Sequence, residues 1–483
     1  MKHKINKVMM YVSGIFFLTV FGCTELDETP LDFTGPGNFY QDKSQVEAAF
    51  TSSMSRIYDR WNDSYGYGAH CCVFNNTDQL HGGDLALSAN TANGMWRDHY
   101  RAIADLNPAI KALNSEDSPI NQDDKDLLMA QARFLRGMNY FYLVRLYGDV
   151  PIIDEETDVI NDEIARKPIT EVYDFIIADM TFAVQNLPDM WGDTPGRPTS
   201  GVAKGFLAKI HLTMATFPIG DASNYAKARD WAADVMDDGV YSLVPNVAEV
   251  FELSNQYGPE MMFSFNATED DKSTPPQIWL PSHMADGWGD HRANRVWFAA
   301  YPEQPRKEAY LLMEDWDGVR YTDWPNGEGH HIKKYLYDTR ENAERLATTQ
   351  NYVLLRYADI LLMYAEAENM VNGGPTQGAV DAVNMIINRA NGGAVNPDNP
   401  LLTIGMTQED FDAAVLNERN YELAFEFDRW FDLVRKRTLC DVVNDEYKVN
   451  CDPNGYLFPI PQADLRLNPL LTQNPGYPTP GGD

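Results

Sequence analysis

Tryptophans and polar side chains gather in the middle of the chain, between residues 240 and 345, where glycine, proline, asparagine and aspartate are frequent. A flat aromatic ring complements the apolar C–H face of a sugar ring, and guanidinium, amide and carboxylate groups pair with the sugar hydroxyls. This combination predicts a sugar-binding surface built on loops. The ligand-binding residues that we predict in this stretch are Trp279, Trp288, Trp316, Trp324 and Arg292.

A second stretch that is rich in aromatic and turn-forming residues covers residues 59–95. Trp288 stands between Gly287 and Gly289, a setting that does not fit the core of a regular element. We nevertheless expect roughly half of the aromatic rings in the two stretches to pack loops onto a scaffold, because such rings bury a large apolar area. The ligand-binding residues that we predict in the first stretch are Trp61, Tyr65, Tyr67 and Asp78.

Sequence motifs for catalysis are missing. The chain contains no metalloprotease, nucleophile-elbow or phosphate-loop motif. A glycosidase needs two carboxylates across the scissile bond, and the 71 acidic residues do not exclude such a pair. We therefore predict a binding protein and no enzyme, with glycoside hydrolysis as the alternative.

Residues 315–318, Asp-Trp-Asp-Gly, resemble the start of a calcium-binding loop. The later ligands of an EF-hand are absent from the spacing that follows. We predict a turn at this position, and neither a metal site nor a cofactor. A structural calcium ion is the alternative that the sequence leaves open.

The formal net charge of −32 makes the surface strongly acidic. Such a surface repels phosphate backbones, so we expect no nucleic-acid partner. Binding to anionic lipids through a basic patch is excluded for the same reason. Any contact with a membrane should depend on a covalent lipid.

The first 22 residues read as a signal peptide. A basic start is followed by an apolar run over residues 8–21, which is shorter than a comfortable membrane span of roughly 20 residues. The pair Gly22-Cys23 at its end resembles a bacterial lipobox, which implies cleavage before Cys23 and acylation of its thiol. Residues 23–40 then form a tether. The alternative is an ordinary secreted protein with a cysteine there by chance.

Four further cysteines remain in the exported chain. Cys440 and Cys451 flank a turn-rich stretch, so a disulfide between them is plausible in an oxidising compartment. Cys71 and Cys72 are adjacent and have histidines nearby, but the usual spacing of zinc ligands is absent. We expect structural or free thiols at Cys71 and Cys72.

Several segments have apolar residues at helical spacing. Consecutive segments form pairs with small residues at the contacts, as in tetratricopeptide-type units, whose stacked helices bury a continuous core. We predict a mostly α fold: one domain over residues 41–483, with loop inserts at 59–95 and 240–345 and a few short strands, such as 261–265. The predicted helices are 126–147, 170–187, 201–217, 225–238, 353–371, 376–391 and 409–436.

Several segments, in order along the chain, resemble the signatures of the SusD/RagB lipoproteins. The first begins with Ala130–Arg136 and runs on to Leu143–Pro151, with Trp96 and Tyr100 in the helix before it. The others, in chain order, are Leu355–Ala367, Asn417–Arg419, Glu422–Glu426, Arg429–Leu433, Pro459–Pro461, Asn468–Pro469 and Gln473–Tyr477.

This resemblance implies a helical scaffold on the cell surface that binds glycans, or less often peptides, and has no catalytic apparatus. It implies an outer-membrane lipoprotein that acts as a lid over a TonB-dependent transporter. The acidic run at residues 24–28 resembles an export signal to the outer face of that membrane. A peptide-binding member of the family, and a helical scaffold that binds protein partners on its concave face, are the alternatives.

The charged residues within these signature segments lie beside apolar helix faces, so we predict ion pairs between packed helices and no contact with ligand. Trp96 and Trp430 we assign to the core. The charged residues concerned are Arg133, Arg136, Arg145, Asp149, Arg356, Asp359, Glu366, Arg419, Glu422, Glu426 and Arg429.

Overall fold

The computed structural model describes most of the chain from residue 39 to residue 479. Among the residues that it describes, no helix is long and apolar enough to cross a membrane. Cys23, Tyr65, Tyr67, Asp78 and Cys451 lie outside the described residues. The described ranges are 39–62, 89–192, 195–267, 279–285, 287–289, 292–325, 329–337, 340–344, 348–426, 428–442 and 456–479.

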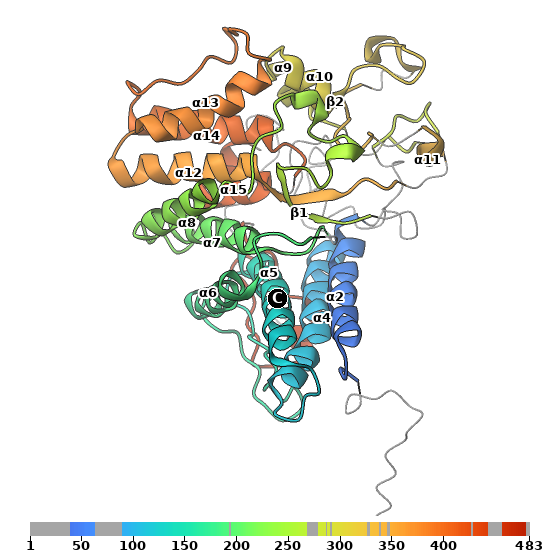
Figure 1. Cartoon of the computed structure of the whole chain (residues 1–483), viewed down its shortest axis with the longest axis vertical. Coiled ribbons are helices and arrows are strands. Elements are labelled where there is room, and N and C mark those ends of the chain that lie inside the picture. Colours follow the sequence, from blue (N-terminus) through green and yellow to red (C-terminus); the bar gives the residue numbers. More distant parts are fainter. Residues whose placement is uncertain are drawn as a thin grey trace, which may run out of the picture.

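Most of the described chain is α-helical, which confirms the predicted fold class. Consecutive long helices pack against each other, and α12 also packs against α8, so the helices after the loops continue the stack formed by those before them (Figure 1). The long helices are α2 (Lys43–Asn62), α4 (Ala89–Asn114), α5 (Gln122–Tyr147), α6 (Ile169–Asn186), α7 (Ser200–Met214), α8 (Asn224–Asp238), α12 (Tyr357–Asn372), α13 (Gln377–Ala390) and α14 (Gln408–Glu422).

Helix α5 begins and ends where its sequence predicts. The side chain of Asn121 accepts a hydrogen bond from the backbone N–H of Asp124 at 3.0 Å, which caps the first turn. Gly148 ends the helix with a φ of 72°, a conformation that glycine adopts without a steric penalty. The exposed carboxylate of Asp149 then accepts the N–H of Ile169 at 2.8 Å and so caps the start of α6.

Small residues on α7 allow the close packing that the sequence predicts. A Cβ atom at Gly205 would lie 2.7 Å from Leu355 Cδ2, and one at Gly201 would lie 2.6 Å from a ring carbon of Tyr241. Glycine therefore lets α7 contact strand β4 (Tyr352–Arg356) at Gly205 and an aromatic ring at Gly201, one turn earlier on the same face.

Two predicted helices are wrong in their extent. The start of the segment 353–371 forms strand β4 (Tyr352–Arg356), because this stretch pairs with β1 (Met261–Phe265), and α12 begins only at Tyr357. The segment 409–436 breaks between α14 and α15 (Arg429–Arg435), where Phe425 has a φ of 67°. The break directs Glu426 toward Arg356, whose Nε donates to its carboxylate at 2.6 Å.

The predicted insert 59–95 is helical at both ends, since α2 continues to Asn62 and α4 begins at Ala89. Trp61 therefore lies in the last turn of α2 and not in a loop. The reason is that the helical pattern of α2 continues past residue 59, although turn-forming residues become frequent there.

A long excursion of the chain, the loop insertion (residues 266–351), leaves the scaffold after β1 and returns at β4. Strands β1 and β4 are antiparallel, and Phe265 faces Tyr352 as the last pair of the ribbon. The predicted strand at 261–265 is confirmed. The elements inside the insertion are short: α9 (Arg295–Ala300), α10 (Pro305–Tyr310), β2 (Leu311–Leu312), β3 (His331–Ile332) and α11 (Arg340–Glu344).

The remaining short elements join and close the scaffold. Two 3-10 turns, η2 (Val247–Glu249) and η3 (Leu253–Asn255), precede β1, and η5 (Tyr321–Asp323) lies within the loop insertion. Near the C-terminus, α16 (Leu439–Val442) and α17 (Gln462–Leu467) follow α15.

A buried ion cluster joins the loop insertion to the helices. Its central pair is Arg356 and Glu422, neither of which has any exposed side-chain surface. Glu422 also accepts from Arg306 Nη1 and Arg389 Nη2, each at 2.7 Å. We call the following residues the inner ion cluster: Arg306, Lys334, Arg356, Arg389, Glu260, Glu418, Glu422 and Glu426.

Most of the signature charges form ion pairs, as the sequence predicts, but Asp149 and Arg145 differ. The exposed Asp149 caps α6 and forms no ion pair with a helix charge among the described residues. A second buried network pairs Arg419 with Asp359 and Asp432. Arg145, by contrast, lies between aromatic rings, with its guanidinium 3.7 Å from the ring centroid of Phe431. Its partner is an aromatic face and not the predicted carboxylate. Trp96 and Trp430 are buried, which confirms both as core residues.

Candidate functional site

Trp288 lies at the tip of a tight turn that the backbone holds in place. Gly287 N–H donates to the carbonyl of Met284 at 2.7 Å, and Gly289 N–H donates to the carbonyl of Leu280 at 2.9 Å. A Cβ at Gly287 would lie 2.3 Å from a backbone oxygen, and Gly289 has a φ of 65°. Both positions therefore require glycine, and the indole between them is 45% exposed. This exposed, rigidly held ring is the arrangement that the sequence predicts.

The ring of Trp316 packs on the same short segment, residues 280–284, that holds the turn of Trp288. This half-buried ring packs against the buried cluster of Leu280 and Met284. The guanidinium of Arg340 lies 5.3 Å from the centroid of this ring, and Arg340 Nη1 also lies 3.3 Å from a carboxylate oxygen of Asp317. Trp288 and Trp316 are thus both anchored on residues 280–284.

The turn that carries Trp316 is held by Asp315. One carboxylate oxygen of Asp315 accepts the N–H groups of Asp317 and Val319, each at 2.9 Å. Burial alone would raise the pKa of Asp315, but these two N–H groups and His283 hold it below its ordinary value. The segment 315–318 is therefore the turn that the sequence predicts. Within the described residues, no group of three or more potential metal ligands comes together.

Trp324 braces this turn from the inside. Its ring is 4% exposed, and its Nε1 donates to the carbonyl of Val319 at 2.9 Å. The ring also lies 5.2 Å from that of His283. This burial leaves no open ring face, so the structure gives Trp324 a supporting role in place of the predicted ligand contact.

Trp279 belongs to the core, which corrects its prediction as a ligand-binding residue. The side chain is completely buried, and Nε1 donates to the hydroxyl of Tyr352 at 2.8 Å. Its ring packs 5.3 Å from that of Tyr335, which is stacked on Tyr352. The indole anchors the loop insertion on strand β4, a long-range contact that local sequence does not reveal.

Arg292 is half-buried and its backbone forms a bridge with His331. Its side-chain Nε is buried and has no hydrogen-bond partner among the described residues. A buried donor without a partner is unfavourable unless a ligand or water accepts from it. The buried Nε of Arg292 is therefore a donor that a bound ligand can satisfy.

Of the remaining predicted residues, Trp61 has a described backbone in α2, and Tyr65, Tyr67 and Asp78 lie outside the described residues. Two residues of the site were missed by sequence reasoning: Arg340, which covers Trp316, and His283, whose Nε2 lies 3.3 Å from Asp315. Neither stands in a motif. The only signal in the sequence was their place in an insert rich in tryptophan.

Among its described residues, the loop insertion presents an exposed indole, a half-buried indole beneath an arginine and a buried guanidinium nitrogen that no described group accepts from. Rings of this kind stack on apolar faces, while guanidinium groups donate to oxygen. We call Trp288, Arg292, Trp316 and Arg340 the loop site. The arrangement can hold a ring-shaped, hydroxyl-bearing ligand.

Comparisons with known proteins agree along nearly the whole chain. A family model described as "SusD family" matches residues 261–447, and a model described as "Starch-binding associating with outer membrane" matches residues 39–212. The chain is 27% identical to SusD-like protein P2 of Formosa agariphila, over 99% of this chain and 100% of the relative. It is 23% identical to a SusD-like protein of Bacteroides ovatus, over 97% and 98% of the two chains.

Solved structures share the fold. A SusD superfamily protein of Parabacteroides distasonis superposes with a TM-score of 0.76 at 24% identity, over 90% of this chain and 99% of that one. The surface glycan-binding protein A of Bacteroides uniformis gives 0.73 at 21% identity, over 90% and 99%. A laminarin binding SusD-like protein gives 0.72 at 22% identity, over 91% and 100%. At these identities, the superpositions establish a common fold and nothing more specific.

Proposed function

Since the chain belongs to the SusD-like family, we propose that it is a glycan-binding protein of the outer membrane that captures oligosaccharides or polysaccharides at the loop site. We propose further that a lipid on Cys23 anchors it to the cell surface and that it delivers glycan to a TonB-dependent transporter. The observation that carries the proposal is the exposed ring of Trp288, which two glycines hold away from the core.

The loop site suits a polysaccharide because its two indole rings differ in exposure: the ring of Trp288 is exposed and that of Trp316 is half-buried. Trp288 offers an open face, and Trp316 offers a ring fixed on Leu280 and Met284. The open face of Trp288 would stack on a sugar of the chain, while the ring of Trp316, packed on Leu280 and Met284, holds Arg340 in place. Because the turn of Trp288 is formed before a ligand arrives, little protein entropy is lost on binding, which favours it. Arg292 and Arg340 would donate to hydroxyls around those sugars.

The names of relatives support a glycan as ligand. One structural neighbour is a laminarin binding protein and another is a surface glycan-binding protein. The family model that matches residues 39–212 is described as starch-binding and associated with the outer membrane. These three descriptions agree on the ligand class and leave the sugar itself open.

The carboxylates near the loop site argue for capture without cleavage. A glycosidase needs an acid and a second carboxylate that face one bond. Asp315 is engaged by backbone N–H groups of its own turn, and Asp317 lies within ion-pair distance of Arg340. We therefore expect binding without release of product.

The test uses the soluble chain that begins after Cys23, run through native gels cast with single neutral or anionic polysaccharides. We expect at least one glycan to retard the protein and Trp288→Ala to reduce the retardation strongly. Trp231→Ala is the matched control, because Trp231 is a partly buried indole on α8, in the helical scaffold.

Unchanged retardation of the Trp288→Ala variant would contradict the role of the loop site. Retardation by no glycan, with the protein folded, would contradict the proposed function and favour a peptide ligand. Reducing sugar released during the run would favour the hydrolase alternative.

A further inference from the structure

We infer that a cavity between the α6–α7 connection and the segment before β1 is a second glycan-binding site, for the end of a neutral oligosaccharide. The cavity has a volume of about 340 Å³ and is lined by Trp191, Tyr241, Gln256 and Tyr257 among others. None of its lining residues belongs to the loop insertion. The inference rests on the proposed function, which supplies the class of ligand, a glycan.

The first wall of the cavity is an indole in a fixed orientation. Trp191 Nε1 donates to the carbonyl of Pro198 at 2.8 Å. The guanidinium of Arg197 lies 5.1 Å from the centroid of this ring and is itself bound to Glu47 of α2 at 2.6 Å. Arg197 is thus already paired and positions the ring, so the cavity has no free cation there to select an anionic sugar.

The second wall is a tyrosine packed flat on the start of α7. Tyr241 lies against Gly201, where a side chain would collide with its ring. Its hydroxyl lies 2.6 Å from Thr199 Oγ1, and burial raises the pKa of Tyr241 so that this hydroxyl stays protonated. Both walls are therefore formed before any ligand arrives, which lowers the entropic cost of binding.

The mouth of the cavity carries polar groups that have no hydrogen-bond partner within the described part of the chain. Tyr257 is 42% exposed, and its hydroxyl makes no hydrogen bond to any described residue. The side-chain carbonyl of Gln256 accepts the N–H of Asn351 at 3.2 Å, while its amide NH₂ donates to none of the residues that the structure describes. One hydroxyl and one amide beside two fixed rings match a sugar ring, with its apolar face and hydroxyl rim.

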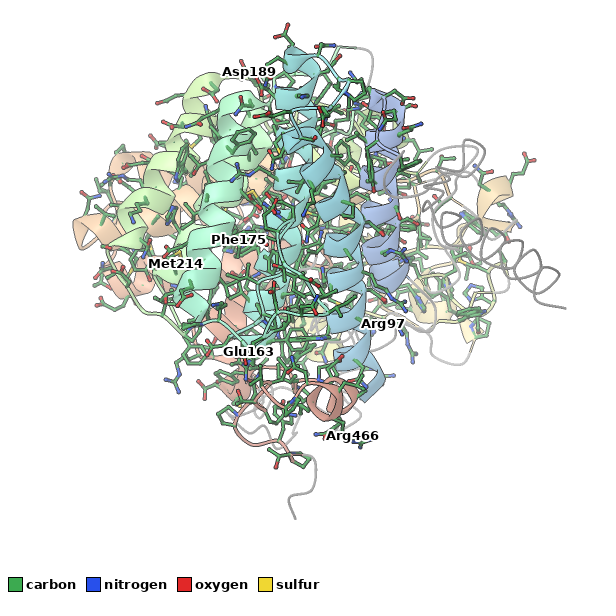
Figure 2. All side chains as sticks on the ribbon, turned by 90° about the horizontal axis from the view of Figure 1, so that it is seen from below. Arg97, Glu163, Phe175, Asp189, Met214 and Arg466 are labelled. Carbon is green, nitrogen blue, oxygen red and sulfur yellow. The ribbon has the colours of Figure 1, made fainter. Side chains whose placement is uncertain are left out.

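The size of the cavity sets the length of ligand that it accepts. Its volume is near the lower end of the roughly 300–1,000 Å³ that is usual for small-molecule sites. We therefore assign it the terminal sugars of a chain and not a long segment. Figure 2 shows Asp189, at the rim of the cavity, at the end of the α6–α7 pair opposite to Glu163 and Met214.

Methionine methyl groups report on the two sites separately. Met190 and Met261 line the cavity, and Met190 is exposed. Met284 lies beneath Trp316 in the loop insertion. The experiment is a methyl NMR titration of protein labelled at the methionine methyl groups with short neutral oligosaccharides, each signal being assigned by a Met→Leu substitution.

We expect oligosaccharide to shift the Met190 and Met261 signals, and to do so in the Trp288→Ala variant as well. Tyr257→Ala should raise the dissociation constant read from Met190 by roughly three- to tenfold, the usual effect of one aromatic contact. The constant read from Met284 should not change. Tyr257→Phe separates the contribution of the hydroxyl from that of the ring.

Each of the other possible results decides for or against the cavity and the loop site. Shifts at Met284 alone would overturn the second site and leave the proposed function intact. Shifts at Met190 and Met261 alone would support the cavity and contradict the loop site. No shift at any of these methyl groups, over the whole panel of oligosaccharides, would overturn both proposals.

Discussion

Arg356 Nη1 donates to the carboxylate of Glu422 at 2.7 Å, and Nη2 of the same arginine donates to the backbone carbonyl of Glu422 at 2.5 Å. The two residues come from the end of β4 and the end of α14. Arg306 of α10 and Arg389 of α13 reach the same carboxylate. Glu422 is therefore the point at which the loop insertion, the β ribbon and the C-terminal helices are joined.

Neutralising this carboxylate should destabilise the protein strongly. Glu422→Gln leaves three buried guanidinium groups with one anion fewer, and breaking a buried ion pair in this way costs about 3–5 kcal/mol. Urea unfolding, followed by circular dichroism, measures the loss. Glu156→Gln is the control, because the Lys111–Glu156 pair is exposed and such pairs contribute about 0–1 kcal/mol. Equal midpoints for the two variants would contradict the importance of the inner ion cluster.

Stability should fall as the pH falls from about 6.5. Burial lowers the pKa of His99 from 6.5 to about 4. Between these values the unfolded chain binds a proton that the folded chain does not, so acid favours unfolding. Arginines hold the pKa of Glu422 well below its ordinary value of 4.5, despite a burial that would raise it. The stabilisation from Glu422 is complete above that value and is lost as the pH falls further.

The measurement is the free energy of unfolding at a series of pH values. We expect a decline with a slope of up to about 1.4 kcal/mol per pH unit from His99 between pH 6.5 and 4, and a steeper decline below pH 4.5. His99→Gln should reduce the first decline and keep the second; part of the first decline remains because burial lowers the pKa of His211 as well. The prediction fails if the variant and the wild type have parallel profiles between pH 6.5 and 4.5.

Two tryptophans of the loop insertion should respond differently to truncation. Trp279→Ala empties a fully buried position and should cost about 3–5 kcal/mol of unfolding free energy. Trp288→Ala removes an exposed ring and should change stability by no more than about 0.5 kcal/mol while it abolishes glycan binding at the loop site. A thermal melt beside the native gel separates these effects. Normal stability of Trp279→Ala would contradict its assignment to the core.

Cys440 forms a disulfide, and its partner lies outside the described residues. We predict Cys451 as that partner, because it is near in sequence and follows a turn-rich stretch. Mass spectrometry of a non-reduced digest should recover one cross-linked peptide pair that contains both cysteines. Cys440→Ser should cost about 2–4 kcal/mol. A cross-link from Cys440 to Cys71 or Cys72 would contradict the pairing.

Acylation of Cys23 should determine where the protein is found. Cys23→Ser removes the thiol that the lipid needs, so the variant should move from the membrane fraction to the soluble fraction and lose incorporation of labelled fatty acid. Protease added to intact cells would test surface exposure of the wild type. Membrane retention of the serine variant would show that the chain is held there by another means.

The helices and the family were predictable because their signals are local or repeated. The apolar period fixes α5, and Gly148 marks its end. The break in the helix predicted over 409–436 was not predictable, because it places Glu426 against Arg356 and Lys334, which lie far away in the sequence. Strand β4 was missed for a related reason, since its partner β1 lies about ninety residues earlier.

The site was predictable only in part. Trp288 could be selected because its two neighbouring glycines are visible in the sequence. Trp279 and Trp324 lie in the same insert rich in turn-forming residues, yet tertiary contacts to Tyr352 and Val319 bury them. Burial of an aromatic ring in an irregular segment depends on residues far away in the sequence. No local pattern distinguishes a ring that binds ligand from a ring that packs in the core.

The pairing of Phe265 with Tyr352 has a consequence for evolution. Because the loop insertion leaves and re-enters the scaffold at one point of the β ribbon, its two ends are neighbours in space. A stretch with adjacent ends can lengthen, shorten or be replaced as a cassette without moving the helices on either side. Relatives can thus acquire new ligands by exchanging this cassette, as long as the replacement supplies cations in the places of Arg306 and Lys334, through which the insertion joins the inner ion cluster.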